Sequence, residues 1–270
     1  MENLAIVTVT YNSSAVIGRL LAALQTPEAE VILVDNGSTD NTREIAAGFA
    51  NMRVIACDNI GYGRAANVGF AQVKTPYVLL LNPDVEISAA TIGQMLACME
   101  QNPAIGILGA NMTGNPAAGL VDVEWIVGAL MLIRREALAK VGMFDENIFL
   151  FYEETDLCRR FVQAGWRLAI LQSAMAGHEA GTSTPASLKV IKIKAWHSAW
   201  SKCYYYRKHF SYLTYCRKTA IKAIHAIRRL IRGAYRRRPD QVVKNFYEIL
   251  GVLAYISGMG AFRKNVGRLT

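Results

Sequence analysis

Four short apolar runs alternate with three helix-like segments over residues 4–81, and this alternation constrains the fold more than any other feature of the sequence. The runs are rich in β-branched residues, as buried parallel strands are, and the segments between them place apolar residues at helical spacing. The expected strands are Leu4–Val9, Glu30–Val34, Met52–Ala56 and Tyr77–Leu81. The pattern predicts an α/β fold: a Rossmann-like, mostly parallel sheet with helices on both faces and ligands at the carboxyl ends of its strands.

Polar and glycine-rich turns follow these strands, where a ligand would bind. Asp35 ends the second strand, the turn Gly61-Tyr62-Gly63 and Arg64 follow the third, and Asp84 follows the fourth. Asp84 could hold a divalent cation together with substrate phosphates, or it could cap a helix. The glycine turn could present its amides and Arg64 to a phosphate, or it could be a tight turn with a surface arginine.

The segment Gly61-Tyr62-Gly63-Arg64-Ala65-Ala66 also fits the loose dinucleotide-binding pattern GxGxx[G/A]. However, it follows the third expected strand rather than the first, and the acidic residue nearest the ribose-binding spacing, Asp84, comes directly after a proline. We therefore do not expect a nicotinamide-dependent oxidoreductase.

Three carboxylates, Glu153, Glu154 and Asp156, follow a group of aromatic residues at the start of an expected helix. Acidic side chains at a helix N-terminus are favoured by the helix dipole. A carboxylate beside aromatic bulk can instead gain the raised pKa of a general base. Glu153 and Glu154 point about 100° apart on a helix, so we do not expect them to share one role.

His178 and Trp125 are two further candidates, each with an alternative. His178 lies in a polar, glycine-rich segment after an expected strand over Leu168–Leu171, where it could ligate a metal or make a polar contact. Trp125 precedes Gly128 and Ala129 and could be a platform for a sugar or ordinary packing.

Charge divides the chain into an acidic body and a basic tail. Residues 1–188 hold 11 Lys+Arg and 19 Asp+Glu, whereas residues 189–270 hold 19 Lys+Arg and 2 Asp+Glu, so the formal net charges are −8 and +17. The boundary is expected near Thr184-Pro185. Residues 189–238 are predicted to be helical, with Trp, Tyr, Lys and Arg interleaved, a composition that favours an anionic membrane surface.

Packing on the body or on a second subunit is the alternative for this tail, and a homodimer is left open. Nucleic acid is not expected, because no nucleic-acid-binding motif accompanies the charge. The longest apolar stretch, Ile249–Phe262, has 14 residues, fewer than the ~20 that a spanning helix needs, although it could dip into the membrane interface.

Five cysteines without CxxC spacing argue against a disulfide framework and a zinc ribbon, and they indicate a reducing compartment. The N-terminal Met1-Glu2-Asn3 lacks the basic residues of a signal peptide, so none is expected. With 52% hydrophobic residues, the composition also excludes a disordered chain.

Taken in order, the motifs of residues 4–184 resemble glycosyltransferase family 2, in particular the branch of bacterial rhamnosyltransferases that build O-antigen and other cell-surface polysaccharides. Each motif is modest alone, but the ordered set is specific. The matching stretches are Val9–Asn12, Val34–Ser38, Asn59–Gly63 through Gly69, Leu81–Val85, Trp125 to Arg135, Gly142–Glu146, Tyr152–Cys158, Gly165–Arg167 and His178.

This resemblance implies a GT-A fold and a role for each matching residue. Thr10 and Tyr11 would flank the base of the donor nucleotide, and Asp35 would bond its ring N–H. Arg64 and the glycine turn would lie near the ribose or the diphosphate. The residues implied in binding the nucleotide-sugar are Thr10, Tyr11, Asn12, Asp35, Asn36, Gly61, Gly63, Arg64, Asn67, Asn82 and Asp84.

The resemblance also implies the metal site and the base. Asp84 would be the remaining carboxylate of the family's DxD position, whose first acid is Asn82 here, and His178 would complete a site for Mg²⁺ or Mn²⁺. Glu154 stands where the family has its catalytic aspartate, with Glu153 and Asp156 as alternatives. The residues implied in binding the acceptor are Trp125, Gly128, Ala129 and Glu153.

The expected function is an inverting, metal-dependent transfer of a sugar, L-rhamnose from dTDP-rhamnose, to a polyprenyl-diphosphate-linked or oligosaccharide acceptor. A UDP-sugar donor and a non-catalytic sugar-nucleotide-binding or glycan-binding module are the alternatives. Residues 1–184 would form the catalytic domain, with a nucleotide-binding half over 1–100 and an acceptor-binding half over 101–184. Residues 185–270 would form a basic, mainly helical extension that holds the enzyme on the cytoplasmic, inner face of the plasma membrane.

Overall fold

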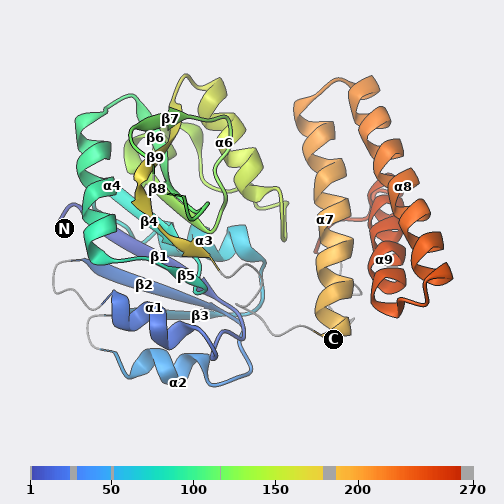
Figure 1. Cartoon of the computed structure of the whole chain (residues 1–270), viewed down its shortest axis with the longest axis horizontal. Helices are drawn as coiled ribbons and strands as arrows, with labels where there is room; N and C mark the ends of the chain where they lie inside the picture. The colour runs from blue at the N-terminus through green and yellow to red at the C-terminus, as the bar shows by residue number, and fades with distance from the viewer. Residues whose placement is uncertain (1, 25–28, 50–51, 116, 179–186, 263–270) are drawn as a thin grey trace. The chain divides into compact units, whose positions relative to one another are not determined.

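The apolar runs of the sequence form a mixed, mostly parallel sheet in the computed structural model (Figure 1). The structure describes residues 2–24, 29–49, 52–115, 117–178 and 187–262. Within these, the larger sheet has the strand order β3-β2-β1-β4-β8-β6-β9-β7, and β5 pairs with β10 in a second, two-stranded sheet. The strands are β1 Leu4–Thr10, β2 Glu30–Asn36, β3 Met52–Cys57, β4 Tyr77–Leu81, β5 Val85–Glu86, β6 Ile105–Asn111, β7 Leu120–Asp122, β8 Leu130–Arg134, β9 Arg167–Met175 and β10 Gly177–His178.

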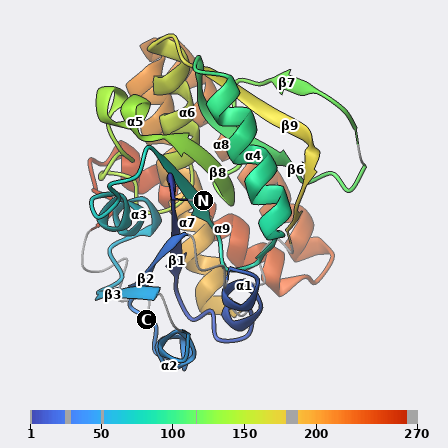
Figure 2. The same cartoon turned by 90° about the vertical axis from the view of Figure 1, so that its left-hand side faces the viewer.

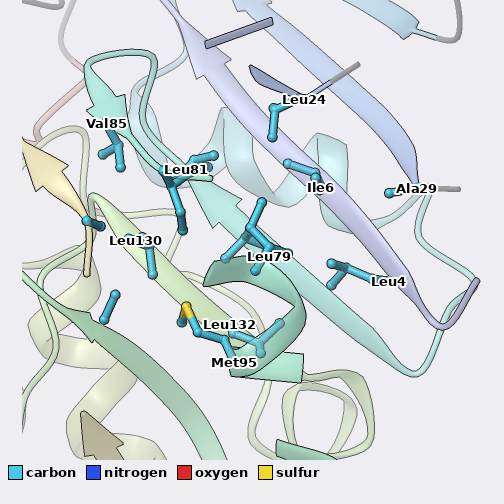
Figure 3. Packing of buried hydrophobic residues seen from close by; sticks show 14 of the residues in the cluster. Leu4, Ile6, Leu24, Ala29, Leu79, Leu81, Val85, Met95, Leu130 and Leu132 are labelled. Atoms are coloured by element: carbon cyan, nitrogen blue, oxygen red, sulfur yellow. The ribbon is translucent and has the colours of Figure 1, made fainter. Parts of the chain in front are cut away.

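Two hydrophobic cores lie on opposite faces of the larger sheet, because successive side chains of a strand alternate in direction. Leu4 and Ile6 of β1 point into one core, and Ala5 and Val7 point into the other. Figure 3 shows the first core, where Leu79 of β4 and Leu132 of β8 meet Met95. The predicted doubly wound arrangement is therefore confirmed.

Helices cover both faces, as the end-on view of the sheet in Figure 2 shows. The first core takes residues from α1, α2 and α4, and the second takes residues from α3, α5 and α6. These helices are α1 Ile17–Ala23, α2 Thr42–Ala47, α3 Tyr62–Phe70, α4 Ala89–Gln101, α5 Arg135–Val141 and α6 Glu153–Gln163.

The four N-terminal strands lie where the sequence predicts them, but the helix after β3 differs. It begins at Tyr62, inside the expected turn Gly61-Tyr62-Gly63. Gly61 precedes it with φ +90°, a backbone conformation that glycine adopts readily. The glycine turn is therefore part of the helix start rather than a separate loop before it.

The chain divides into two units: Met1–Asp145 with Glu154–Pro185, and Glu146–Glu153 with Ala186–Thr270. Unlike the expected boundary near Thr184-Pro185, this division groups residues 146–153 with the C-terminal helices. Residues 179–186, which contain the expected boundary, lie outside the described residues. The assignment of separate nucleotide-binding and acceptor-binding halves stays a prediction.

The C-terminal unit is built on three long helices, α7 Leu188–His209, α8 Tyr212–Tyr235 and α9 Pro239–Ile256. Gly251 of α9 lets two helices approach closely, since a Cβ there would lie 2.3 Å from the backbone oxygen of Trp196 on α7. The buried carboxylate of Glu248 on α9 pairs with Lys222 at 3.0 Å and with Arg229 at 2.9 Å, which fastens α8 to α9.

The predicted basic helical extension is confirmed, but the faces of its helices differ from expectation. Trp196 and Trp200 of α7 are buried and pack with Ala254 and Ala261. Part of the stretch 249–262 thus helps to build the core of this unit, and its insertion into the membrane interface stays a prediction. In the described part of the chain, no helix combines the length and the apolar character that crossing a membrane requires.

Candidate active site

The loops that follow β1 and β2 are joined to each other at the carboxyl end of the sheet. The backbone N–H of Asn12 donates to Ser38 Oγ at 2.9 Å, and the Asn12 side-chain oxygen accepts from the Thr39 backbone N–H at 2.8 Å. Asn12 has φ +50°, in the left-handed region that Asn tolerates better than most residues. Its side chain therefore holds the two loops together.

Asp35, at the end of β2, is buried among donors. One carboxylate oxygen accepts from Thr10 Oγ1 at 3.3 Å, and the other accepts from the backbone N–H of Ser38 at 3.2 Å. Arg43 Nε lies 3.6 Å from the second oxygen. An ionised carboxylate offers about four lone-pair sites, so Asp35 keeps capacity to accept a further N–H. Sequence reasoning missed Arg43, which carries no motif.

Asn36 connects the end of β2 to the loop after β3. Its side-chain oxygen accepts from the backbone N–H of Ile60 at 2.9 Å, and its side-chain nitrogen donates to Asn59 Oδ1 at 3.3 Å. At Gly37, with φ +85°, a Cβ would lie 2.8 Å from the backbone nitrogen of Asn59. Gly61 and Gly63 follow on this loop and α3, and Arg64 lies in the first turn of α3.

Asn67 on α3 also has a structural task. Its side-chain nitrogen donates to the backbone oxygen of Phe144 at 3.0 Å, and its side-chain oxygen accepts from the Phe144 N–H at 3.0 Å. Both polar groups of this buried amide are engaged. We therefore assign Asn67 to positioning α3 against the segment at Phe144.

Asn82 and its neighbours form a connected group beside the end of β4. Tyr62 Oη lies 2.7 Å from Asn82 Oδ1 and 3.1 Å from the backbone oxygen of Gly128, to either of which it can donate its single proton. The Asn82 backbone N–H donates to the backbone oxygen of Ala129 at 2.8 Å. Sequence reasoning missed Tyr62 as a site residue, although its place between two glycines could have drawn attention to it.

Asp84 and His178 come together although 94 positions separate them. β5 and β10 pair in antiparallel register, with Val85 opposite His178. As a result, His178 Nε2 lies 3.5 Å from Asp84 Oδ1. The Asp84 side chain is 2% exposed and the His178 side chain 19% exposed, so the pair is sheltered from water.

Glu154 lies in the first turn of α6, next to the segment that holds Trp125 and Gly128. Burial raises the pKa of the Glu154 carboxyl above its usual range, and hydrogen bonds from the backbone, Thr155 and the Trp125 side chain partly oppose that rise. A Cβ at Gly128 would lie 3.2 Å from the Glu154 Cβ, so the segment at Gly128 packs closely against Glu154. The Trp125 side chain itself is half-exposed.

Asp156, one alternative for the base, is held in an ion pair. Its side chain is fully buried, and Arg160 Nε lies 2.8 Å from its Oδ2. Arg160 in turn donates to the backbone oxygens of Val141, Gly142 and Met143. Asp156 therefore fastens α6 to the loop after α5. Glu153, the other alternative, is the first residue of α6.

The sequence is similar to known glycosyltransferases. Residues 5–121 match the sequence model of the family described as Glycosyl transferase family 2. The N-acetylglucosaminyl-diphospho-decaprenol L-rhamnosyltransferase of Mycobacterium tuberculosis strain H37Rv is 29% identical over 243 residues, which cover 68% of this chain and 79% of that protein. The rhamnosyltransferase WbbL of Escherichia coli K12 is 24% identical, with 65% of this chain and 83% of WbbL covered. Over residues 5–121 the chain is therefore similar to glycosyltransferase family 2.

Solved structures support the fold of this glycosyltransferase. The mannosyltransferase PcManGT from Pyrobaculum calidifontis, in complex with GDP-Man and Mn²⁺, has a TM-score of 0.61 at 14% identity and covers 95% of this chain and 74% of its own. Residues 1–349 of Staphylococcus aureus TarS have a TM-score of 0.57 at 16% identity, with 95% and 92% covered. These likenesses confirm the predicted GT-A fold.

Asp84 and His178 fit a divalent cation in this glycosyltransferase. Two ligands at adjacent corners of an octahedron with bonds of about 2.1 Å lie about 3 Å apart, close to the 3.5 Å between Asp84 Oδ1 and His178 Nε2. Among the described residues no third His, Cys, Asp or Glu completes the group. The other ligands would therefore come from diphosphate oxygens and water, as is common for Mg²⁺.

The helical unit of the glycosyltransferase contains a cavity of about 690 Å³. Its walls include Trp200, Tyr204, Tyr215 and Tyr255, with Arg207 among them. No residue that the sequence predicts for the active site lines this cavity.

Proposed function

We propose that the chain transfers L-rhamnose from dTDP-rhamnose to a lipid-linked acceptor in bacterial cell-surface glycan assembly, with inversion at the anomeric carbon and a Mg²⁺ or Mn²⁺ ion. The observation that carries the metal-dependent part is the approach of His178 to Asp84 through the pairing of β5 and β10. The named activities of two relatives, both rhamnosyltransferases, support the donor sugar. The name of the mycobacterial relative supports a polyprenyl-diphosphate-linked acceptor.

In this proposal the residues at the ends of β1 and β2 bind the nucleotide. Asp35 keeps lone pairs available, so it accepts the ring N–H of the base while Thr10 and Ser38 hold its carboxylate in place. Tyr11 and Thr10 flank the base. The turn at Gly61 and the guanidinium of Arg64 lie toward the ribose and the diphosphate.

Asp84 and His178 would hold the cation, whose chemistry is to stabilise the negative charge that develops on the diphosphate leaving group. Glu154 takes the proton of the acceptor hydroxyl as that oxygen attacks the anomeric carbon from the face opposite the diphosphate. Burial favours this role, because a raised pKa brings the carboxyl nearer the working pH, where a general base is most effective. The Trp125 side chain donates a hydrogen bond to Glu154. In this proposal it orients the carboxylate and forms part of the acceptor site.

Thermal stabilisation by nucleotides tests the donor and the metal together. The melting temperature of the full chain would be measured with dTDP, UDP, GDP and NAD, each with and without Mn²⁺ or Mg²⁺. A ligand at a hundredfold excess over its Kd adds about 2.7 kcal/mol to the free energy of unfolding. We expect the largest shift with dTDP, and a larger one when metal is present.

Other results of these melting experiments would contradict specific parts of the proposal. A preference for UDP would keep the glycosyltransferase and overturn the rhamnosyl donor. Stabilisation without any effect of metal would contradict the Asp84–His178 site. No shift with any nucleotide would favour a chain that has kept the fold without the activity.

We also propose that the enzyme works at the cytoplasmic face of the plasma membrane, where a lipid-linked acceptor presents its sugar. The net charge of +17 over residues 189–270 supports this location, because anionic lipids attract basic segments.

A further inference from the structure

Helix α8 has two apolar faces, and the described part of the chain covers only one of them. Thr219, Ala226 and Gly233 are buried and mark the face that packs within the helical unit. A second row of large apolar side chains is exposed. Its members are Leu213 (81% exposed), Ile221 (38%), Ile224 (47%), Ile227 (45%), Ile231 (62%) and Tyr235 (90%).

These exposed residues share one sector of the helix. At about 100° per residue, they occupy a sector of about 120° that lies opposite the face marked by Ala226. Scattered single apolar residues are normal on a surface, but a continuous row over several helical turns is typical of a binding site. We call this row, Leu213 to Tyr235, the isoleucine stripe.

Cations lie among and beside the residues of the isoleucine stripe. Helix α8 contains six Lys and Arg and no Asp or Glu, and Arg236, Arg237 and Arg238 follow it directly. Lys222 and Arg229 pair with Glu248 and hold the helix in place. Arg217, Arg228 and Arg232 are exposed. On the helical wheel Arg217 and Arg228 lie within the sector of the stripe, and Arg232 lies at its edge.

We propose that α8 docks on an anionic membrane surface, with the isoleucine stripe in the acyl boundary and the neighbouring arginines at the lipid phosphates. Exposed apolar side chains accompanied by cations bind a helix in the plane of an anionic bilayer, and the long arginine side chains can extend to the phosphates while the isoleucines enter the acyl boundary. A second copy of the chain would cover the stripe but bring two cationic helices together, which costs free energy. A nucleic acid would match the arginines but leave the isoleucines in water.

This inference rests on the proposed membrane location and narrows it from residues 189–238 to a single helix face. Trp196 and Trp200 are buried in the helical unit and are therefore not part of this docking face.

Vesicle binding by the full chain tests the proposal. We expect co-sedimentation with vesicles of phosphatidylglycerol and phosphatidylcholine, and much less with phosphatidylcholine alone. The pair Ile224→Ser and Ile231→Ser is expected to lower the partition coefficient at least tenfold, because each change removes apolar surface from the bilayer. The matched control is Leu188→Ser with Leu253→Ser, two changes of the same kind at residues 57% and 55% exposed on α7 and α9.

The charge requirement has its own variant. At about 1 kcal/mol for each basic residue near an anionic surface, Arg228→Gln with Arg232→Gln should reduce partition by roughly tenfold or more. Retained binding in both the serine and the glutamine pair would overturn the proposal. A wild-type dimer that the serine pair converts to a monomer would also overturn it and assign the stripe to a second copy.

Turnover on a short-chain, water-soluble acceptor separates this inference from the proposed function. The serine pair should keep the wild-type rate there, since the stripe lies outside the catalytic residues. A wild-type protein that binds vesicles but transfers no rhamnose would contradict the proposed function and leave the docking face standing.

Discussion

The Glu154→Gln variant is expected to lose a factor of about 10²–10⁴ in kcat, the contribution typical of a positioned general base. Gln has nearly the same shape and can still accept the hydrogen bonds from Thr155 and Trp125, but it cannot take a proton. The dissociation constant for the nucleotide should therefore change little. Steady-state kinetics and nucleotide titrations of the same preparation would measure both quantities.

The pH dependence of this variant follows from the direction of the pKa shift. Burial raises the folded-state pKa of Glu154 above its unfolded value, so its stabilising contribution is present below the unfolded pKa and is lost as pH rises through the folded pKa. At about pH 7 the buried carboxylate costs stability that Gln avoids. Relative to wild type, Glu154→Gln should melt at a higher temperature there, and less so in acid.

Two further variants sharpen the interpretation of Glu154. Glu136→Gln changes an exposed glutamate paired with Lys140, and it should leave kcat at the wild-type value. Glu154→Asp keeps a carboxylate and should recover part of the rate.

Wild-type kcat should rise with pH through the pKa of Glu154 and then level off. Full activity of Glu154→Gln would assign the base to another group.

The Asp84→Asn variant is the second change with a large expected effect. It removes a negative charge from the metal site while preserving shape, so metal binding at the diphosphate should weaken strongly. Loss of one electrostatic stabiliser of a developing charge typically costs about 10²–10³ in kcat. The stabilisation by dTDP should also lose its dependence on Mn²⁺, a change that melting curves would detect.

Glu86→Gln is the matched control for Asp84→Asn. Glu86 lies two residues further on β5, is exposed, and pairs with Arg19 at 3.1 Å. Its loss should leave both kcat and the metal effect unchanged. If Asp84→Asn kept a metal-dependent shift equal to that of wild type, the cation would have to bind elsewhere.

The strands of the larger sheet could be predicted from the sequence, because each strand has a recognisable local pattern of residues. β1 to β4 are short runs rich in Val, Ile and Leu, and their polar ends place Asp35 and Asp84 at one edge of the sheet. The ordered motifs likewise identify the family, since they depend on residue order alone.

The roles of individual polar residues could not be predicted from local patterns, because their hydrogen-bond partners lie far away in the sequence. The Asn67 side chain hydrogen-bonds to the backbone of Phe144, 77 positions away. The Asn36 side chain hydrogen-bonds to the loop after β3. Nothing near either residue in the sequence distinguishes a structural amide from a ligand-binding one. The pairing of Asp156 with Arg160 does have a local signal that our sequence analysis did not use, because a spacing of four on a helix brings opposite charges together.

The basic tail shows a second limit of sequence patterns. Periodicity identifies apolar faces but does not say which face protein covers. Trp196 and Ile224 both fit a helical repeat, yet the first is buried and the second exposed. The buried and exposed faces can be distinguished only once the packing of the three helices against one another is known.

Sugar transfer itself is the most direct test of the proposed function. The full chain would be incubated with dTDP-L-rhamnose, Mn²⁺ and an N-acetylglucosaminyl-diphospho-lipid, and the product analysed by mass spectrometry and NMR. We predict one added deoxyhexose with an anomeric configuration opposite to that of the donor, and almost no product with Glu154→Gln. A retained configuration, or product formed equally well by Glu154→Gln, would contradict the assignment of Glu154 as the base of an inverting transferase.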